Sequence, residues 1–346
     1  MRVEVVGRPA DGDRRWIGGV LCRDLLGADG RPLLRKGHRL GAEDAASLAA
    51  TTDRELHLLW LDRRDVDENT AAVRLAGAVC GPGVEAAPPV ESQVRISAAC
   101  AGLVRVDASR LAAINSVEGV TVFTVRDGLP VKRGRTLAGV KITGLAIPDD
   151  VLSEAERRGT PAGPAAPVVA VLPFQALRVA AVVRQRVGEE LRRRFEDSLH
   201  SRVGWFGGSV TSVDYPEDRA ATRESILAAA ASADLLAVVG VASVDPVEET
   251  WCDLLDSGAR VVRRGLPVHP GSSYWLMRLG EVPVIGVASC GMFARRSALD
   301  LLLARVFAGE PLDDAFLAGL GHGGLLQGGE LSEALSYEGE PAAEPR

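Results

Sequence analysis

Apolar and polar positions follow two different patterns along the chain, and the change falls near residue 175. After it, short apolar runs alternate with segments of helical periodicity. Arg178–Val183 (RVAAVV) is a continuous apolar run, typical of a strand that is covered on both faces. In Gly188–His200, the residues Leu191, Phe195 and Leu199 recur at helical spacing. This alternation predicts a parallel α/β sheet in the second half of the chain.

The rest of the second half continues the same alternation and predicts a three-layer α/β/α sandwich over residues 175–312. Residues 313–346 are rich in glutamate, proline and alanine from Gly328 onward, and we expect them to form a flexible acidic tail. The expected strands are Ser209–Val213, Leu235–Val239, Arg260–Val262 and the hairpin Trp275–Leu279 with Val282–Val287, and the expected helices are Asp218–Ser232, Pro246–Ser257 and Met292–Phe307.

Residues 1–174 show strand-like alternation with few helical segments. Arg2–Val6 and Gly119–Val125 alternate, and Gly37–Ala50 and Asp65–Val79 carry apolar residues at helical spacing. We therefore expect a β-rich α+β region ahead of the α/β domain.

Composition excludes several classes of protein. The net charge is −6 and aromatic residues make up 4% of the chain, so neither a basic nucleic-acid surface nor a stacking platform is expected. No apolar run approaches the roughly 20 residues of a membrane helix. The five cysteines are scattered without a CxxC pair, which is typical of reduced thiols. We expect a cytoplasmic protein without a nucleic-acid or membrane partner.

The turn over Gly240–Asp245 leaves a predicted strand and enters a predicted helix. Ligands of open parallel sheets lie beyond such strand ends. Small residues allow close backbone approach, and free N–H groups at the start of a helix favour an anion. Asp245 fits an N-cap, with Pro246 at the first helical position and Glu248 in capping-box spacing. The alternative is a well-capped turn with no ligand.

Two other turns occupy equivalent positions. Ala288–Gly291 again places small residues before a helix, and Arg295 and Arg296 follow where positive charge would oppose the helix dipole unless an anion lies nearby. Cys290 is expected to be a buried or neighbouring thiol, since no histidine accompanies it. Arg184–Val187 follows the first strand of the domain, and its arginines suit a phosphate or an acidic ring edge. Exposed basic loops are the alternative for both.

Several short motifs occur in an order found in one family. The chain resembles the molybdopterin-binding domain, which occurs in molybdopterin adenylyltransferase and molybdopterin molybdotransferase. The resemblance covers most of the chain. The motifs that carry it are Gly240–Pro246 (GGxSVDP-like), Pro267–Gly271 (PVxPG), Leu279–Met292 (LGxxPVxGLPG-like), Arg35–His38 (KGH), Ala113–Ser116 (AINS), Pro130–Gly134 (PVKxG) and Leu320–Gly324 (LGHGG).

The resemblance implies molybdopterin as ligand or substrate, with Mg²⁺ and molybdate as candidate participants. It implies that the backbone of Gly240, Val241, Ala242 and Val244 and the hydroxyl of Ser243 hold the terminal phosphate. Arg184 and Arg186 would offset the ligand's charge, and Asp245 would position a metal ion or molybdate as the catalytic group. The remaining expected contacts are Pro270, Gly271, Ser289, Cys290 and Gly291.

This chain departs from the family pattern at three places. Val241 stands at the second loop glycine, Ala288-Ser289 replaces a proline-glycine pair, and Arg184–Val187 replaces a T-G-x-E turn. Binding is therefore better supported than turnover. The readings left open are a molybdotransferase, a non-catalytic carrier, sensor or insertion protein for a molybdenum enzyme, and a scaffold without a ligand. Relatives of this fold are usually oligomers, so a homo-oligomer is expected by analogy.

Overall fold

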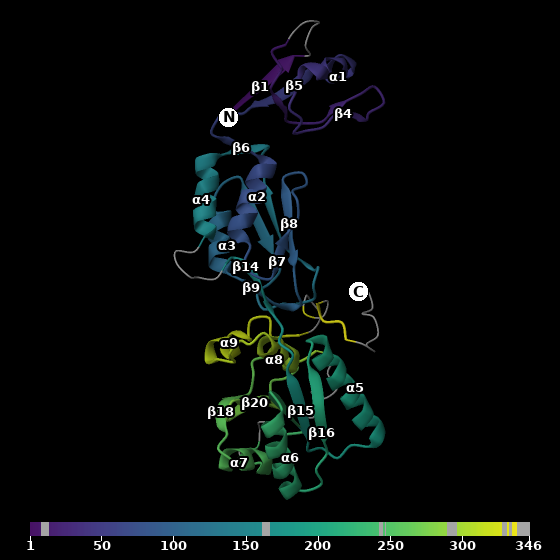
Figure 1. Cartoon of the computed structure of the whole chain (residues 1–346), viewed down its shortest axis with the longest axis vertical. Coiled ribbons are helices and arrows are strands. Elements are labelled where there is room, and N and C mark those ends of the chain that lie inside the picture. Colours follow the sequence, from purple (N-terminus) through teal and green to yellow (C-terminus); the bar gives the residue numbers. More distant parts are fainter. Residues whose placement is uncertain are drawn as a thin grey trace. The chain divides into compact units, whose positions relative to one another are not determined.

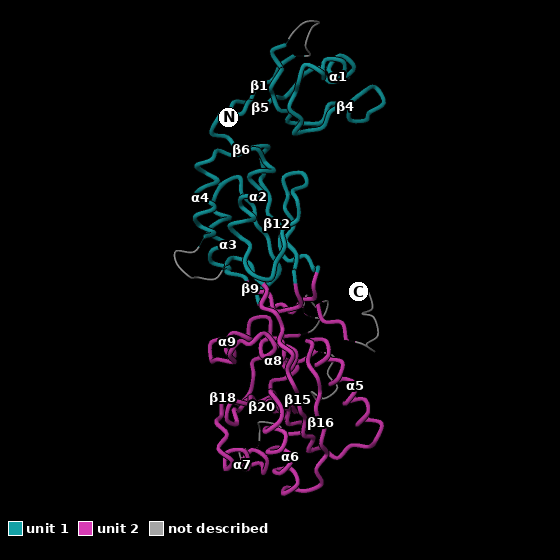
Figure 2. The backbone as a smooth tube through the Cα atoms, viewed as in Figure 1, with its two compact units in different colours: residues 1–99, 106–127, 134–170 teal, residues 100–105, 128–133, 171–346 magenta. Residues whose placement is uncertain are grey.

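The computed structural model describes residues 1–7, 14–160, 167–241, 245, 247–288, 296–326, 331 and 334–337. The chain is a mixed α/β protein with two compact units (Figure 1). Figure 2 shows unit 1 as Met1–Ala99, Val106–Asp127 and Gly134–Ala170, and unit 2 as Cys100–Arg105, Gly128–Arg133 and Val171–Arg346. Among the described helices, none is long and apolar enough to cross a membrane.

Unit 1 is built from small antiparallel sheets and short helices. Helix α2 packs against β8 and β12, and α3 packs against β10. The sheet orders are β1-β5-β2, β10-β12-β8-β7, β13-β6 and β3-β4. The elements are β1 (Arg2–Gly7), β2 (Val20–Leu21), β3 (Leu25–Leu26), β4 (Pro32–Leu34), η1 (Ala42–Asp44), α1 (Ala45–Ala50), β5 (Glu55–Trp60), β6 (Asp65–Asp67), α2 (Glu68–Val79), β7 (Val84–Ala86), β8 (Gln93–Ala98), α3 (Ala108–Asn115), β10 (Val120–Thr124), β12 (Thr136–Ile142), β13 (Ala146–Pro148) and α4 (Asp149–Gly159).

The A-I-N-S motif of unit 1 has a structural role. Ile114 is fully buried. The side-chain amide of Asn115 donates to the carbonyl oxygen of Val122 at 2.8 Å, and its oxygen accepts from the Val122 N–H at 2.7 Å. The end of α3 is thereby fastened to β10.

Unit 2 contains a six-stranded sheet in the order β16-β15-β17-β20-β19-β18. The first four of these strands are parallel, whereas β19 runs antiparallel to both of its neighbours. A smaller sheet has the order β11-β9-β14. The strands are β9 (Gly102–Val106), β11 (Pro130–Val131), β14 (Val169–Pro173), β15 (Arg178–Val183), β16 (Ser209–Asp214), β17 (Leu235–Val239), β18 (Arg260–Arg264), β19 (Trp275–Leu279) and β20 (Val282–Val287).

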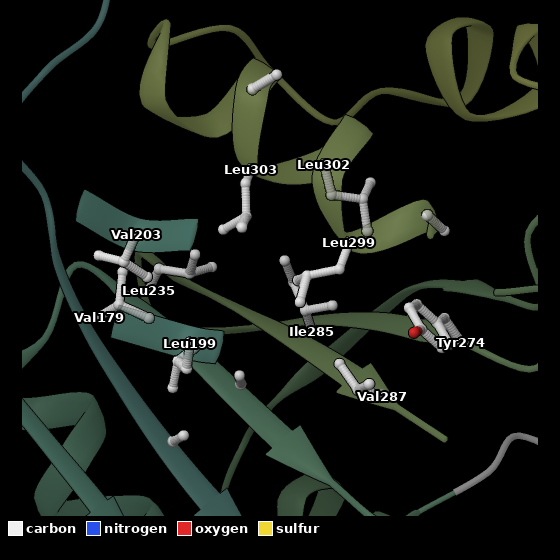
Figure 3. Close-up of a cluster of buried hydrophobic side chains, with 14 of the residues drawn as sticks. Val179, Leu199, Val203, Leu235, Tyr274, Ile285, Val287, Leu299, Leu302 and Leu303 are labelled. Carbon is white, nitrogen blue, oxygen red and sulfur yellow. The ribbon is translucent and has the colours of Figure 1, made fainter. Parts of the chain in front are cut away.

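Helices cover both faces of the six-stranded sheet. Alternate residues of β15 belong to different core clusters, with Val179 in one and Ala180 in the other. The first cluster contains residues of α5 and α8 (Figure 3), and the second contains residues of α6 and α7. This explains the continuous apolar run of the central strands. The helices are α5 (Glu189–Trp205), α6 (Arg219–Ser232), α7 (Glu249–Asp256), α8 (Ala298–Phe307) and α9 (Asp314–Gly319).

Capping residues set where two of the predicted helices begin. Helix α7 begins at Glu249 rather than at residue 246, because Glu248 is its N-cap. Helix α8 begins at Ala298, because Ser297 caps it and forms a capping box with Asp300, and the predicted start at residue 292 lies outside the described residues.

The prediction of a flexible tail from residue 313 is wrong for the part of that segment which the structure describes. Residues Asp314–Gly319 form α9, in which Leu317 is fully buried. Further on, Leu335 and Tyr337 are 1% and 6% exposed and belong to the core cluster of α5 and α8. Their apolar area outweighs the acidic composition of the segment.

Candidate functional site at the carboxyl edge of the sheet

The three turns singled out in the sequence begin at one edge of the sheet. In the register of the parallel strands, Val183 of β15 pairs with Val239 of β17, which pairs with Val287 of β20. The residues that follow, Arg184, Gly240 and Ala288, therefore leave neighbouring strand ends. This is the edge at which open parallel sheets bind ligands.

Gly240 is the point at which the first two turns approach each other. Its φ angle is +93°, in the left-handed region that favours glycine. A Cβ atom at this position would lie 3.0 Å from the backbone nitrogen of Gln185. The Gly240 N–H donates to the carbonyl oxygen of Val287 at 2.8 Å, which ties the turn to β20. Only glycine fulfils both the backbone and the space requirements here.

Val241 was expected to contact the ligand through its backbone, and its side chain lies in the core. Val241 is 3% exposed and belongs to the core cluster of α6 and α7. Its carbonyl oxygen accepts a hydrogen bond of 3.0 Å from the indole nitrogen of Trp275. The side chain therefore fills the core below the turn.

Asp245 does not cap helix α7 as the sequence predicts. Its carboxylate accepts from the backbone N–H of Val247 at 2.9 Å, a bond within the turn. The N-cap is Glu248, whose carboxylate accepts from the N–H of Trp251 at 2.9 Å. Since a carboxylate of the chain itself occupies the start of α7, the helix N-terminus does not support the predicted anion site.

In the described part of the chain, Asp245 is not accompanied by other side chains that could complete a metal site. Among the described residues, no group of three or more His, Cys, Asp or Glu side chains could hold one. Carboxylate clusters are the usual ligands of Mg²⁺. The residues that the structure describes therefore do not fit a resident Mg²⁺, and we derive no chemistry through one.

Arg184 turns toward the helices rather than toward open space. Its Nε atom donates to the hydroxyl of Thr250 at 3.1 Å, and its Nη1 atom donates to the hydroxyl of Thr222 at 3.0 Å. Its Nη2 atom lies 3.6 Å from the carboxylate of Glu249. Arg186, two residues later, is exposed.

Arg296 is buried and bonded within the chain, so the alternative of an exposed basic loop is wrong for this residue. It is 4% exposed and donates to the carbonyl oxygen of Leu335. Its guanidinium carbon also lies 4.6 Å from the ring centroid of Tyr337. The arginine holds the C-terminal segment, 39 residues away in sequence.

Six of the predicted contacts lie outside the described residues, as does Arg295. These six are Ala242, Ser243, Val244, Ser289, Cys290 and Gly291.

Pro270 and Gly271 pack against the start of α8. Gly271 has a φ angle of +127°, and the carbonyl oxygen of Pro270 accepts from the N–H of Ala298 at 2.9 Å. The preceding residue, His269, donates from its backbone to Gly324 at 2.7 Å. The P-V-x-P-G and L-G-H-G-G motifs therefore pair with each other, a contact that the sequence alone does not indicate.

A buried polar cluster near α8 was missed from the sequence. Asp300 has no exposed surface and accepts from Arg202 at 3.1 Å, from the hydroxyl of Tyr337 at 2.5 Å and from the backbone of Ser297 at 2.7 Å. Burial, reinforced by the charge of Asp300, raises the pKa of Tyr337. The S-x-x-D spacing of Ser297 and Asp300 is a capping-box pattern that could have predicted part of this cluster.

Two of the hollows formed by described residues of unit 2 bear on the site. The one beside the strand ends Val239 and Val287 has a volume of about 10 Å³, which is near the minimum for one water molecule.

The other hollow, with a volume of about 760 Å³, lies along α5 and is lined in part by Lys132. The Lys132 ammonium donates to the carbonyl oxygen of Trp205 and lies 4.4 Å from its ring centroid. Lys132 thus caps the end of α5, and burial lowers its pKa.

Comparisons with known proteins give remote likenesses to solved structures. No family model matches the chain, and no curated protein matches it. One solved structure of the molybdopterin biosynthesis protein moeA from Pyrococcus horikoshii shares 14% identity, covering 71% of this chain and 81% of that chain, with a TM-score of 0.30. A second structure of moeA from that organism shares 11% identity, covering 90% and 76%, with a TM-score of 0.26. Because identity and TM-score are both low, the chain's own residues have to support any functional proposal.

Proposed function

We propose that unit 2 binds molybdopterin by its terminal phosphate at the carboxyl edge of the sheet and acts in molybdenum cofactor biosynthesis. In this proposal residues 175–312 form the three-layer α/β/α domain of the molybdopterin-binding fold. The observation that carries the proposal is the convergence at Gly240. Its φ angle of +93° and the 3.0 Å approach of the Gln185 backbone match a turn in which glycine permits close backbone packing.

The proposed phosphate contacts are backbone N–H groups of the turn 240–244 and the hydroxyl of Ser243. Such preorganised donors bind an oxyanion without a net positive charge. Arg186, which is exposed near the same edge, supplies the positive charge. Asp245 faces the molybdate in the transferase form of the proposal.

Carriage of the cofactor without turnover is the second candidate function. The specific observation that favours it is the state of Asp245, whose carboxylate already accepts the Val247 N–H at 2.9 Å. No acidic cluster accompanies it among the residues that the structure describes. A carrier requires the phosphate site alone, whereas a transferase also has to handle molybdate.

The binding proposal is tested by titrating molybdopterin against the wild type and two matched glycine variants. Gly240→Ala and Gly258→Ala introduce the same side chain at φ angles of +93° and +88°, but a Cβ at residue 258 meets nothing within 4 Å. We expect molybdopterin affinity to fall by about tenfold or more in Gly240→Ala and to remain unchanged in Gly258→Ala. Equal affinities in all three proteins, or no saturable binding by the wild type, would contradict the proposal.

The same preparations separate the transferase from the carrier. Wild-type protein is incubated with adenylylated molybdopterin and molybdate, and AMP release is measured. Molybdate-dependent AMP release that Asp245→Asn abolishes supports the transferase. Saturable binding without AMP release supports the carrier.

A further inference from the structure

Arg184 contacts both ends of the turn that leads from β17 to α7. Its backbone N–H donates to the carbonyl oxygen of Val239, the residue directly before Gly240, at 2.8 Å. Its side chain donates to Thr250, in the first turn of α7, at 3.1 Å. The span between Val239 and Thr250 is therefore bridged by a single residue from a neighbouring strand.

The side-chain contacts of Arg184 continue into a directed chain of hydrogen bonds. The Thr250 hydroxyl accepts from Arg184 and donates to the Glu248 carboxylate at 3.1 Å. On α6, the Thr222 hydroxyl accepts from Arg184 and donates to the carbonyl oxygen of Asp218 at 2.7 Å. Both threonines are 2% exposed, so their hydroxyls require these partners.

The charge of Arg184 is balanced within the protein. Glu249 lies 3.6 Å from its Nη2 atom, and Glu248 is joined to it through Thr250. Its side chain is 21% exposed. An anionic ligand would have to compete with these carboxylates for the guanidinium.

We propose that Arg184 is a positioning residue of the proposed phosphate site and that it does not bind the ligand itself. It fixes the two ends of the turn 240–248 by joining β17 to α6 and α7. This inference rests on the proposed function for the ligand, but the contacts of Arg184 do not depend on it. It replaces the expectation from sequence that Arg184 offsets ligand charge.

The planar guanidinium suits this role better than an ammonium group. It directs two N–H groups at two hydroxyls in fixed geometry, whereas a lysine presents one point charge. Positive charge alone should therefore not replace Arg184.

The test separates charge from geometry by changing the acceptors instead of the arginine. Thr222→Val with Thr250→Val keeps the charge of Arg184 and the side-chain shape but removes both hydroxyls. We expect this pair, Arg184→Met and Arg184→Lys all to lower molybdopterin affinity by about tenfold. The conservative pair Thr222→Ser with Thr250→Ser keeps the hydroxyls and should restore wild-type affinity. Wild-type affinity in Arg184→Lys or in the valine pair would overturn the proposal.

Amide hydrogen exchange without ligand tests the inference independently of the proposed function. The Gly240 N–H bonds to Val287 and should exchange faster in Arg184→Met, Arg184→Lys and the valine pair. Arg186→Met, a change in the exposed arginine of the same turn, should lower affinity and leave this exchange rate unchanged. If wild type binds no molybdopterin, the proposed function fails, and the exchange rates alone decide the role of Arg184. Unchanged exchange in all Arg184 and valine variants would overturn it.

Discussion

Two arginines contact helices on opposite faces of the six-stranded sheet, and their surroundings differ. Arg184 bonds to neutral hydroxyls of α6 and α7 and keeps 21% of its side chain exposed. Arg202 of α5 keeps 6% exposed and pairs with Asp300 of α8, which is fully buried. Both arginines are satisfied within the chain, but only Arg202 depends on a buried opposite charge.

This difference indicates that Arg202 is needed for global stability, whereas Arg184 is needed for the local geometry of the turn at Gly240. A buried ion pair is weakly stabilising as a whole, but removal of one partner leaves an uncompensated charge in a medium of low dielectric constant. Arg184 is partly exposed and its carboxylate neighbour Glu249 is 56% exposed, so the loss of Arg184 leaves no buried charge without a partner. We therefore expect changes around Arg202 to affect global stability and changes around Arg184 to affect mainly the turn at Gly240.

The largest expected effect is that of Asp300→Asn. It removes the charge that compensates Arg202, so the free energy of unfolding should fall by about 3–5 kcal/mol. Urea unfolding monitored by tryptophan fluorescence measures this loss. The matched control is Glu281→Gln, which removes the partner of Arg278 at a position with 95% exposure and should change little. Equal losses in the two variants would show that burial of the pair is irrelevant.

The next effect is that of Tyr337→Phe, which keeps the aromatic ring against Arg202 and Arg296 but removes the hydroxyl that donates to Asp300. A hydrogen bond to a charged group contributes about 1.5–3 kcal/mol. We expect a loss of that size in urea unfolding. A loss below the error of the measurement would mean that Arg202 and Ser297 alone satisfy Asp300.

Alkaline pH should lower the stability of the folded protein through Tyr337, which belongs to the cluster around Arg202, and not through the contacts of Arg184. The pKa of Tyr337 is raised by burial and by Asp300, whereas the phenol of the unfolded chain ionises near pH 10. Above that pH the folded protein holds a proton that the unfolded chain releases, so stability falls as pH rises. Wild type should lose up to about 1.4 kcal/mol more per pH unit than Tyr337→Phe between about pH 10 and 11. Parallel stability curves would contradict the pKa shift.

The smallest expected effect on global stability is that of Arg184→Met. The loss should be about 1 kcal/mol, because water reaches the partly exposed guanidinium and both threonine hydroxyls keep the bonds that they donate to Asp218 and Glu248. Urea unfolding beside Asp300→Asn provides the comparison. A loss as large as that of Asp300→Asn would remove the distinction between the two arginines.

Local patterns in the sequence predict much of unit 2 because they record which residues face the core. The apolar run Arg178–Val183 is a central parallel strand, as predicted, and the strand order then places three turns at one edge. Capping is less predictable, because Asp245 and Glu248 both fit the start of α7 and only the folded turn selects between them. The functions of Ser243 and Cys290 stay predictions, since both lie outside the described residues.

Contacts between distant segments could not be predicted from any local pattern. Arg296 and Leu335 are 39 residues apart. From the sequence, an arginine before a helix is as consistent with an anion site as with a hydrogen bond to a distant segment of the chain. The pairing of His269 with Gly324 is similar, since each motif alone reads as a turn. The residues that bring such segments together are apolar, and apolar packing does not specify its partner in the sequence.

The side chain of Asn115 has a consequence for association between molecules. Strand β10 is an edge of its sheet, and edge strands offer unpaired N–H and C=O groups on which a second chain can add a strand. At Val122 both of these groups are already bonded to the Asn115 amide. The asparagine thus takes the place of a neighbouring strand for one residue, and at Val122 a second chain finds neither a free N–H nor a free C=O for intermolecular β-pairing.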